Sequence, residues 1–254
     1  MKLLTITFTL TLLVGFSVIP ASAQIVDGLV AYWAFDEGSG DTVNDSSGNG
    51  HNGTLVGDPQ WTDGRLGGGL HFDQTEDEVM VPFHENLNHE AFTICAWANA
   101  ETGGTGHRAV ISSRDDFPQR GYIFYADPNN VWQFWTGVGS GWNPINGPAA
   151  NNIDGWDHLA GVYADNSQKF YVNGEMVGES AAVLSVNTAQ ELLIGAGANE
   201  TSSHNYFFRG IIDEVCIFSH ALSADEIMGL MNTNPTPVEA AGKIAITWGQ
   251  LKAK

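Results

Sequence analysis

The chain has 254 residues and a formal net charge of −19, with 29 acidic and only 10 Lys and Arg side chains. Binding to nucleic acid through phosphate contacts needs clustered Lys and Arg, so this composition excludes that mode. The length permits a single β domain with a large core.

The first residues are predicted to form a signal peptide over 1–23. Met1 and Lys2 supply a short positive start, an apolar run follows from Leu3 to Ile19, and Ala21-Ser22-Ala23 offers small residues for cleavage. The alternative is an uncleaved membrane anchor, which Pro20 and the small-residue triplet disfavour. Since the sequence has no second apolar run of that length, we expect a secreted or cell-surface protein without a membrane span after cleavage.

Short strand-like runs and turn signals alternate along the rest of the chain. The runs are rich in β-branched and aromatic residues, and Gly, Asn, Asp and Pro clusters separate them; they include 29–35, 79–81, 92–97, 122–125 and 131–135. The pair Asn173-Gly174 suits a type I′ turn and predicts a hairpin. This rhythm predicts an all-β sandwich.

One short helix is expected near the end, over residues 223–231. Ser223 can cap it, and Glu226 three residues later can complete a capping box. Residues 233–254 then read as a linker and a C-terminal tail. Because this tail is relatively rich in basic residues, it is a candidate sorting or docking peptide, and an end that pairs with nothing is the alternative.

Seven sequence blocks carry a resemblance to a known family. They stand in the family's order, in the segments 28–37, 45–53, 70–82, 92–97, 156–160, 170–174 and 212–226. Over 27–232 the chain resembles the LamG-like jelly-roll (concanavalin A-like lectin/glucanase) domains of secreted bacterial proteins. The resemblance implies a two-sheet antiparallel jelly-roll sandwich whose first and last strands are adjacent. It leaves the function open, because this fold hosts sugar binding, adhesion, protein interaction and glycan hydrolysis.

The chain is not expected to be an enzyme. Hydrolases of this fold resemble one another in a strand with Glu-x-Asp-x-Glu or a close variant, and the sequence contains no such strand. The nearest acidic run, Asp73 to Glu78, falls where the family has a turn, so we interpret it as a solvated loop. The histidines lack the His-Glu-x-x-His spacing of metalloproteases. No residue is therefore assigned a catalytic role.

The segment from Arg114 to Asn146 is the candidate ligand-binding region. It combines aromatic rings, which stack on sugar faces, with amide and guanidinium groups, which satisfy sugar hydroxyls. Trp142 is expected to stack on the ligand, and Arg114 and Arg120 to contact hydroxyl or carboxylate groups. The alternative is that many of these rings face the core, since strands alternate their faces.

An extracellular carbohydrate is the expected ligand. The acidity of the chain favours a neutral or mildly acidic glycan over a polyanion. The competing hypothesis is a surface adhesion or structural protein whose jelly roll binds a protein partner.

The two cysteines, Cys95 and Cys216, are expected to form a disulfide. Both lie in predicted strands, and an exported protein meets an oxidising environment. The alternative is two buried free thiols that pack as small apolar groups.

A structural Ca²⁺ site is also predicted, with Asp36, Asp45 and Asp213 as side-chain ligands and backbone oxygens near His51 completing the shell. The family resemblance places Asp213 beside the first strand. The alternatives are a turn-forming Asp45 and a solvated Asp36.

Overall fold

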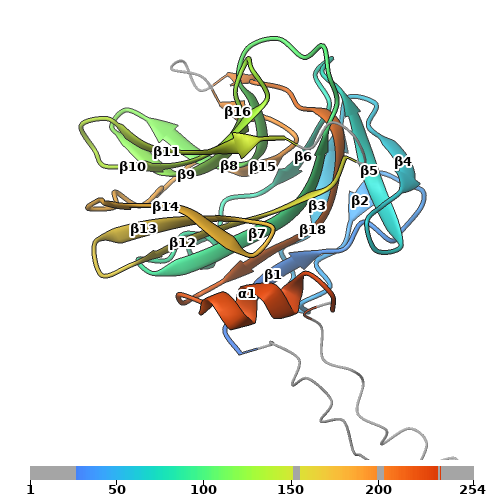
Figure 1. Cartoon of the computed structure of the whole chain (residues 1–254). Helices are drawn as coiled ribbons and strands as arrows, with labels where there is room; N and C mark the ends of the chain where they lie inside the picture. Colours follow the sequence, from blue (N-terminus) through green and yellow to red (C-terminus); the bar gives the residue numbers. More distant parts are fainter. Residues whose placement is uncertain (1–26, 151–154, 199–202, 234, 236–254) are drawn as a thin grey trace, which may run out of the picture.

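The computed structural model describes residues 27–150, 155–198, 203–233 and 235. Two antiparallel sheets of eight strands each face one another and form the body of the domain (Figure 1). The predicted two-sheet all-β jelly roll is confirmed. Within the described ranges no helix is both long and apolar enough to cross a membrane.

Sheet A contains the first and last strands of the domain side by side. Its order is β14 (Glu175–Ala181), β13 (Ser167–Val172), β12 (Asp157–Ala164), β7 (Phe92–Ala100), β18 (Arg209–Phe218), β5 (Gly68–Asp73) and β4 (Gln60–Asp63), and β1 (Leu29–Trp33) also pairs with β18. Tyr32 of β1 lies opposite Cys216 of β18, as the family resemblance implies.

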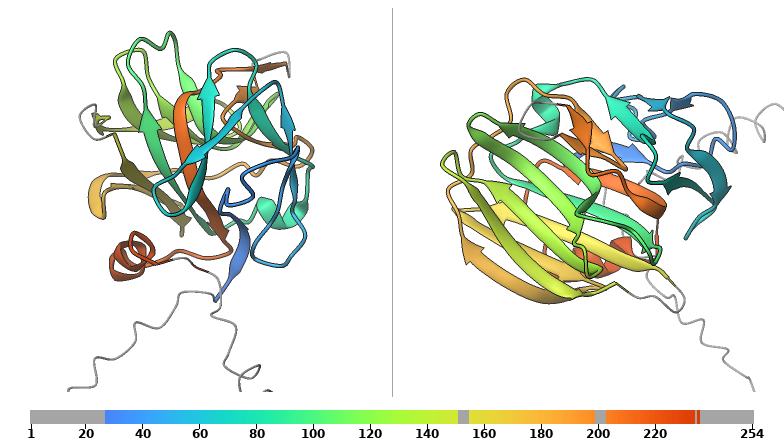
Figure 2. Two further views of the ribbon diagram at one scale, coloured as in Figure 1. Left: turned by 90° about the vertical axis from the view of Figure 1, so that its right-hand side faces the viewer. Right: turned by 90° about the horizontal axis from the view of Figure 1, so that it is seen from above.

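Sheet B carries the central part of the chain. Its order is β11 (Trp142–Ala149), β10 (Val131–Gly137), β9 (Gln119–Ala126), β8 (Arg108–Asp116), β15 (Leu192–Ile194), β6 (Glu78–Val81), β3 (Gly53–Val56) and β2 (Thr42–Val43). The right-hand view of Figure 2 looks onto this sheet. A small two-stranded sheet of β16 (Gly197–Ala198) and β17 (His204–Asn205) contacts β8.

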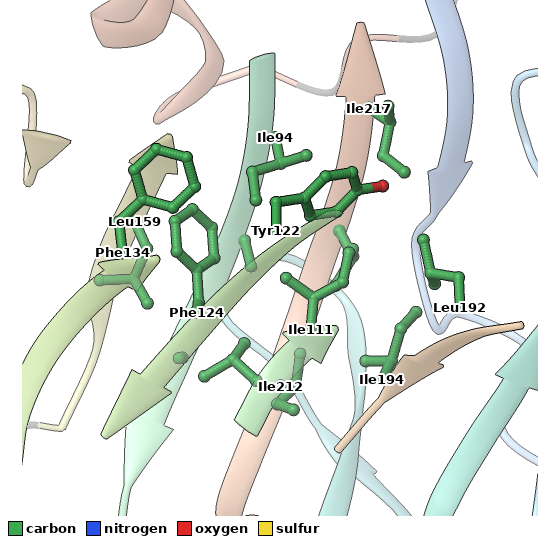
Figure 3. Packing of buried hydrophobic residues seen from close by; sticks show 14 of the residues in the cluster. Ile94, Ile111, Tyr122, Phe124, Phe134, Leu159, Leu192, Ile194, Ile212 and Ile217 are labelled. Atoms are coloured by element: carbon green, nitrogen blue, oxygen red, sulfur yellow. The ribbon is translucent and has the colours of Figure 1, made fainter. Parts of the chain in front are cut away.

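Apolar side chains of both sheets fill the space between them (Figure 3). Period-two alternation sends Tyr122 and Phe124 of β9 into this core, and both are at most 1% exposed. They pack there against residues of sheet A such as Phe92 and Phe170. The intervening residues of β9 therefore point to the outer face of sheet B.

Turn and cap chemistry explains the smaller elements. Asn173 and Gly174 have φ of 53° and 79°, the positive values that a type I′ turn needs, and they join β13 to β14. The predicted helix is α1 (Ala224–Leu230), and Ser223 and Glu226 form its capping box. A single 3₁₀ turn, η1 (Glu85–Leu87), follows β6.

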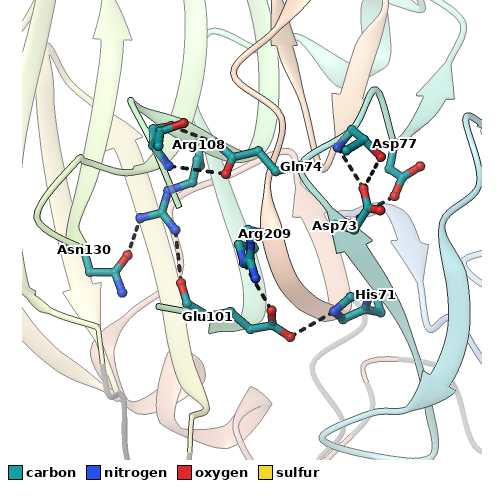
Figure 4. A network of polar contacts seen from close by, with 10 residues as sticks. His71, Asp73, Gln74, Asp77, Glu101, Arg108, Asn130 and Arg209 are labelled. Atoms are coloured by element: carbon teal, nitrogen blue, oxygen red, sulfur yellow. Dashed lines mark hydrogen bonds and ion pairs between the residues drawn. The ribbon is translucent and has the colours of Figure 1, made fainter. Parts of the chain in front are cut away.

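The acidic run Asp73 to Glu78 differs from its prediction as a solvated loop. Asp77 and Glu78 are only 3% and 2% exposed. Asp77 accepts hydrogen bonds from the backbone N–H groups of Asp58 and Asp73, so it ties two loops together. The run adjoins a polar network in which Glu101 contacts His71 and Arg209 (Figure 4). The burial is explained by these partners, which the sequence alone does not reveal.

Candidate functional site

The outer face of sheet B carries a cluster of aromatic rings. Tyr125 of β9 and Trp135 of β10 point away from the core, with ring centroids 5.4 Å apart. Trp142, at the start of β11, lies 6.4 Å from Trp135. We call the full set of adjoining rings the ring cluster; it consists of His107, Tyr125, Trp135, Trp142 and Tyr206.

A buried ion pair supports the ring cluster. Arg114 donates from Nε to Asp116 Oδ2 at 2.7 Å and from Nη1 to the Tyr125 hydroxyl at 2.8 Å. Its guanidinium lies 5.3 Å from the centre of the Trp142 ring and 5.1 Å from that of Tyr206, within cation–π range. Since Arg114 is only 6% exposed, it acts as a support for the rings.

Hydrogen bonds also fix the two indoles of the cluster. Trp142 Nε1 donates to Asp116 at 3.1 Å, and Trp135 Nε1 donates to Gln133 at 3.0 Å. Gln133 in turn donates to Asn146 across β10 and β11. Both Trp side chains stay partly exposed, so the face presents fixed rings beside amide groups.

Tyr206 reaches the ring cluster from the segment after β17. His204 of β17 bridges two carboxylates, with Nδ1 2.5 Å from Glu78 and Nε2 2.7 Å from Glu191. Burial opposes charge on this imidazole, but the hydrogen bonds to Glu191 and Glu78 raise its pKa above the ordinary value. This bridge anchors the short strand two residues before Tyr206.

The structure unites two of the three predicted ligand-binding residues. Arg114 and Trp142 meet in the ring cluster. In the β8–β9 hairpin Arg120 lies opposite Asp115, the residue next to Arg114. Because neighbouring residues of a strand point to opposite faces, the Arg120 side chain lies on the other face of sheet B from Arg114. It donates to Thr188 at 2.9 Å instead.

Sequence reasoning missed Tyr206 and His107 as members of this cluster. Both lie outside the segment 114–146, and Tyr206 follows Trp142 by more than sixty positions. The Ala109 N–H donates to the Tyr206 carbonyl at 2.7 Å, and this long-range contact brings the Tyr206 ring to Tyr125. Their spacing in the sequence carries no signal of this contact.

The family comparison agrees with this architecture. The model of the family described as the concanavalin A-like lectin/glucanases superfamily matches residues 73–228, more than half of the chain. The chain belongs to the concanavalin A-like lectin/glucanase superfamily. A search of curated proteins found no match.

Solved structures with a similar fold include a binding domain of a mosquitocidal protein and a botulinum neurotoxin structure. The binding domain of Paraclostridial mosquitocidal protein 1 has a TM-score of 0.65 at 19% identity, over 82% of this chain and 53% of that one. A structure of botulinum neurotoxin type C, described with cell entry that depends on two ganglioside molecules, has a TM-score of 0.64 at 17% identity. The match covers 84% of this chain and 52% of that one. The chain thus spans about half the length of these two proteins.

A third similar structure matches in length as well. Domain 4 of an extracellular arabinanase from Geobacillus stearothermophilus, solved with arabinotriose, has a TM-score of 0.61 at 20% identity, over 80% of this chain and 98% of that one. At these identities the likeness concerns the fold.

The three predicted calcium ligands each accept hydrogen bonds from backbone N–H groups. Asp45 Oδ1 accepts hydrogen bonds from the backbone N–H groups of Tyr32 and Ser47, and Oδ2 accepts one from that of His51. This is the turn-forming role that the sequence left open. Within the described residues no group of three or more His, Cys, Asp or Glu is placed to hold a metal ion.

The other two carboxylates are also engaged by the backbone. Asp213 accepts N–H groups of Arg65, Leu66 and Glu214, and Asp36 accepts that of Gly68. A carboxylate oxygen that accepts an N–H group keeps lone-pair capacity for a cation, and Asp36 is engaged through Oδ1, so the calcium assignment of Asp36, Asp45 and Asp213 stays a prediction.

The calcium assignment predicts that calcium raises the stability of the domain. A ligand that binds only the folded state raises the apparent stability. The melting temperature should therefore be several degrees higher in millimolar calcium than in chelator. Equal melting temperatures in the two solutions would contradict the assignment.

The expected disulfide is not formed, and both cysteines are free thiols. Cys95 of β7 and Cys216 of β18 do face each other, just beyond a register shift that follows Asp213. They pack in a small apolar cluster with Tyr32 and Ala160, which α1 covers through Ile227 and Leu230. The structure corresponds to the alternative of two thiols that pack as small apolar groups.

Proposed function

We propose that this domain is an exported, non-catalytic module that binds an extracellular carbohydrate through the outer face of sheet B. The observation that carries the proposal is the ring cluster, in which partly exposed indoles are fixed above a buried ion pair. Export rests on the predicted signal peptide over 1–23, which lies outside the described residues.

The chemistry of the face suits a sugar. Trp135 and Trp142 can stack on the apolar face of a pyranose or furanose ring, and Asn146 retains hydrogen-bonding capacity for hydroxyl groups. Because hydrogen bonds from both indoles already fix their orientation, the ligand orders few side chains on binding. The arabinotriose complex of a similar domain supports this choice of ligand class.

The hydrogen bonds that Asp116 accepts support a binding role over a hydrolytic one. Retaining hydrolysis needs a nucleophilic carboxylate and a second carboxyl about 5 to 5.5 Å away. Asp116 accepts hydrogen bonds from Arg114 and from Trp142, so both of its oxygens are engaged. Within the ring cluster its role is to hold side chains in place.

A neutral glycan is the proposed ligand. Arg114 donates to Asp116 and Tyr125 and is buried, so it does not present an exposed positive charge to a ligand on this face. The net charge of −19 repels polyanions at long range.

Replacing Trp142 by alanine is expected to weaken glycan binding about 5-fold to 150-fold, since stacking of one ring on an indole contributes about 1–3 kcal/mol by analogy with base stacking. A glycan array identifies the ligand, and calorimetric titration gives the affinity. Trp142→Phe should restore part of the loss. Phe83→Ala, which changes an exposed ring outside the cluster, is the control.

Two results would contradict the proposal. Unchanged affinity of a correctly folded Trp142→Ala protein would remove the ring cluster from the binding site. Recovery of a protein partner by pull-down, with no glycan bound on the array, would favour the adhesion hypothesis instead.

A further inference from the structure

A second feature of the surface lies where the two sheets end. Residues between β1 and β2, at the end of β3 and along β4 line a groove of about 650 Å³. β2 is the last strand of sheet B and β4 the last strand of sheet A, so the groove lies at the open side of the sandwich (Figure 1). It shares no residue with the ring cluster.

We propose that this groove is a second saccharide-binding site, selective for neutral sugars. Its volume falls within the range of about 300–1,000 Å³ that is typical of small-molecule sites. Three features argue for this ligand class: a fixed indole, open loop surfaces and carboxylates without a neighbouring cation.

Trp61 supplies the stacking surface. It packs partly against the core and also lines the groove, so the indole bridges the interior and the ligand space. Its Nε1 donates to the Gly40 carbonyl at 3.1 Å, which fixes the orientation of the ring. A side chain that is already held loses little conformational entropy when a sugar stacks on it.

The loops beside Trp61 leave room for a ring. A Cβ atom added at Gly38 or Gly40 would meet no atom within 4 Å, so the loop before β2 has open space beside it. Both residues have positive φ, of 65° and 90°, which favours glycine at these positions.

The polar lining determines the class of sugar. Asp41, Asp58 and Gln60 are exposed in the groove, and no Lys, Arg or His lines it. Carboxylates accept strong hydrogen bonds from sugar hydroxyl groups. They repel sulfate esters and uronic acids, which is why we infer a neutral saccharide.

The test follows the indole N–H signal of Trp61 by NMR in the full chain. The probes are neutral trisaccharides of arabinose, xylose and glucose, with trigalacturonic acid as the charged counterpart. At millimolar concentration at least one neutral probe should shift the Trp61 signal, and trigalacturonic acid should bind at least ten times more weakly. The double variant Asp41→Asn/Asp58→Asn should weaken the neutral probe about tenfold, because charge-assisted hydrogen bonds become ordinary ones. Thr62→Ala, an exposed neighbour outside the lining, is the matched control.

The same titration in the Trp142→Ala variant separates the two proposals. A persisting shift at Trp61 supports the groove whether or not the ring cluster binds sugar. A shift at Trp142 in the parent protein with none at Trp61 overturns the groove and leaves the proposed function intact. Equal binding of trigalacturonic acid, or a Trp61 signal that no neutral probe moves, also overturns the inference.

Discussion

Replacing Arg114 by leucine is expected to lower the free energy of unfolding by about 3–5 kcal/mol, because removing one member of a buried ion pair leaves the other uncompensated. Asp116 is only 4% exposed, and its contact with Arg114 Nη2 is 2.7 Å long. Without the guanidinium, the carboxylate keeps Trp142 Nε1 as a donor but loses its countercharge. Urea denaturation followed by tryptophan fluorescence measures the change.

Arg120→Leu is the matched control for this experiment. Arg120 and Asp115 lie on the same hairpin, 3.7 Å apart, but the arginine side chain is 30% exposed. A solvent-exposed pair contributes about 0–1 kcal/mol, so this variant should be close to the parent. Arg114→Leu/Asp116→Leu should recover much of the loss, since it leaves no unpaired charge. Equal costs for the Arg114 and Arg120 variants would refute the supporting role of the ion pair.

The stability of the domain is expected to fall as the pH rises through about 8, owing to a buried acid on sheet A. Burial raises the pKa of Glu214 to about 8, and the carboxylates of Asp213 and Asp36 add to the effect. The Tyr32 hydroxyl donates to Glu214 Oε2 at 2.6 Å, whereas Oε1 is buried and has no partner within the described residues. Burial also raises the pKa of Asp213, to about 7, but three backbone N–H groups support its ionised form. We therefore assign the buried proton to Glu214.

Proton linkage gives the sign of this change in stability. The folded state holds a proton on Glu214 that the unfolded chain releases near pH 4.5, so the contribution of Glu214 to the free energy of unfolding is complete below that pH. The contribution decreases by about 1.4 kcal/mol per pH unit above pH 4.5, and the total loss by pH 8 is on the order of 5 kcal/mol.

Glu214→Gln tests this assignment, because glutamine keeps an acceptor for Tyr32 and carries no charge. Denaturant unfolding from pH 5 to 9 should show a shallower decline for the variant than for the parent, and the variant should be the more stable protein at pH 9. His204 contributes a decline of the same sign in both proteins, so the difference between the two curves isolates Glu214. Parallel curves would place the proton elsewhere.

Most of the fold was predictable because its signals are local. Alternating apolar residues, Asn173-Gly174 and the Ser223 capping box each determine their own short segment. The family resemblance added the pairing of the first and last strands, which no local pattern encodes.

The candidate site was predictable only in part, because its members come from distant segments. Trp142 stood out as an aromatic residue among turn formers, and the structure places it with Arg114. The face on which each ring of β9 lies depends on register, and Tyr206 joins only through the segment after β17. The sequence also shows the three Asp residues of the predicted calcium site but not the backbone N–H groups that contact their oxygens.

The most direct test of carbohydrate binding at the ring cluster is an NMR titration of the indole N–H signals with the glycan that the array selects. The proposed site predicts that the signals of Trp135 and Trp142 move together and saturate at one affinity, while that of Trp33, which is buried in the core, stays fixed. A saturating glycan that leaves both Trp135 and Trp142 unmoved would contradict the account.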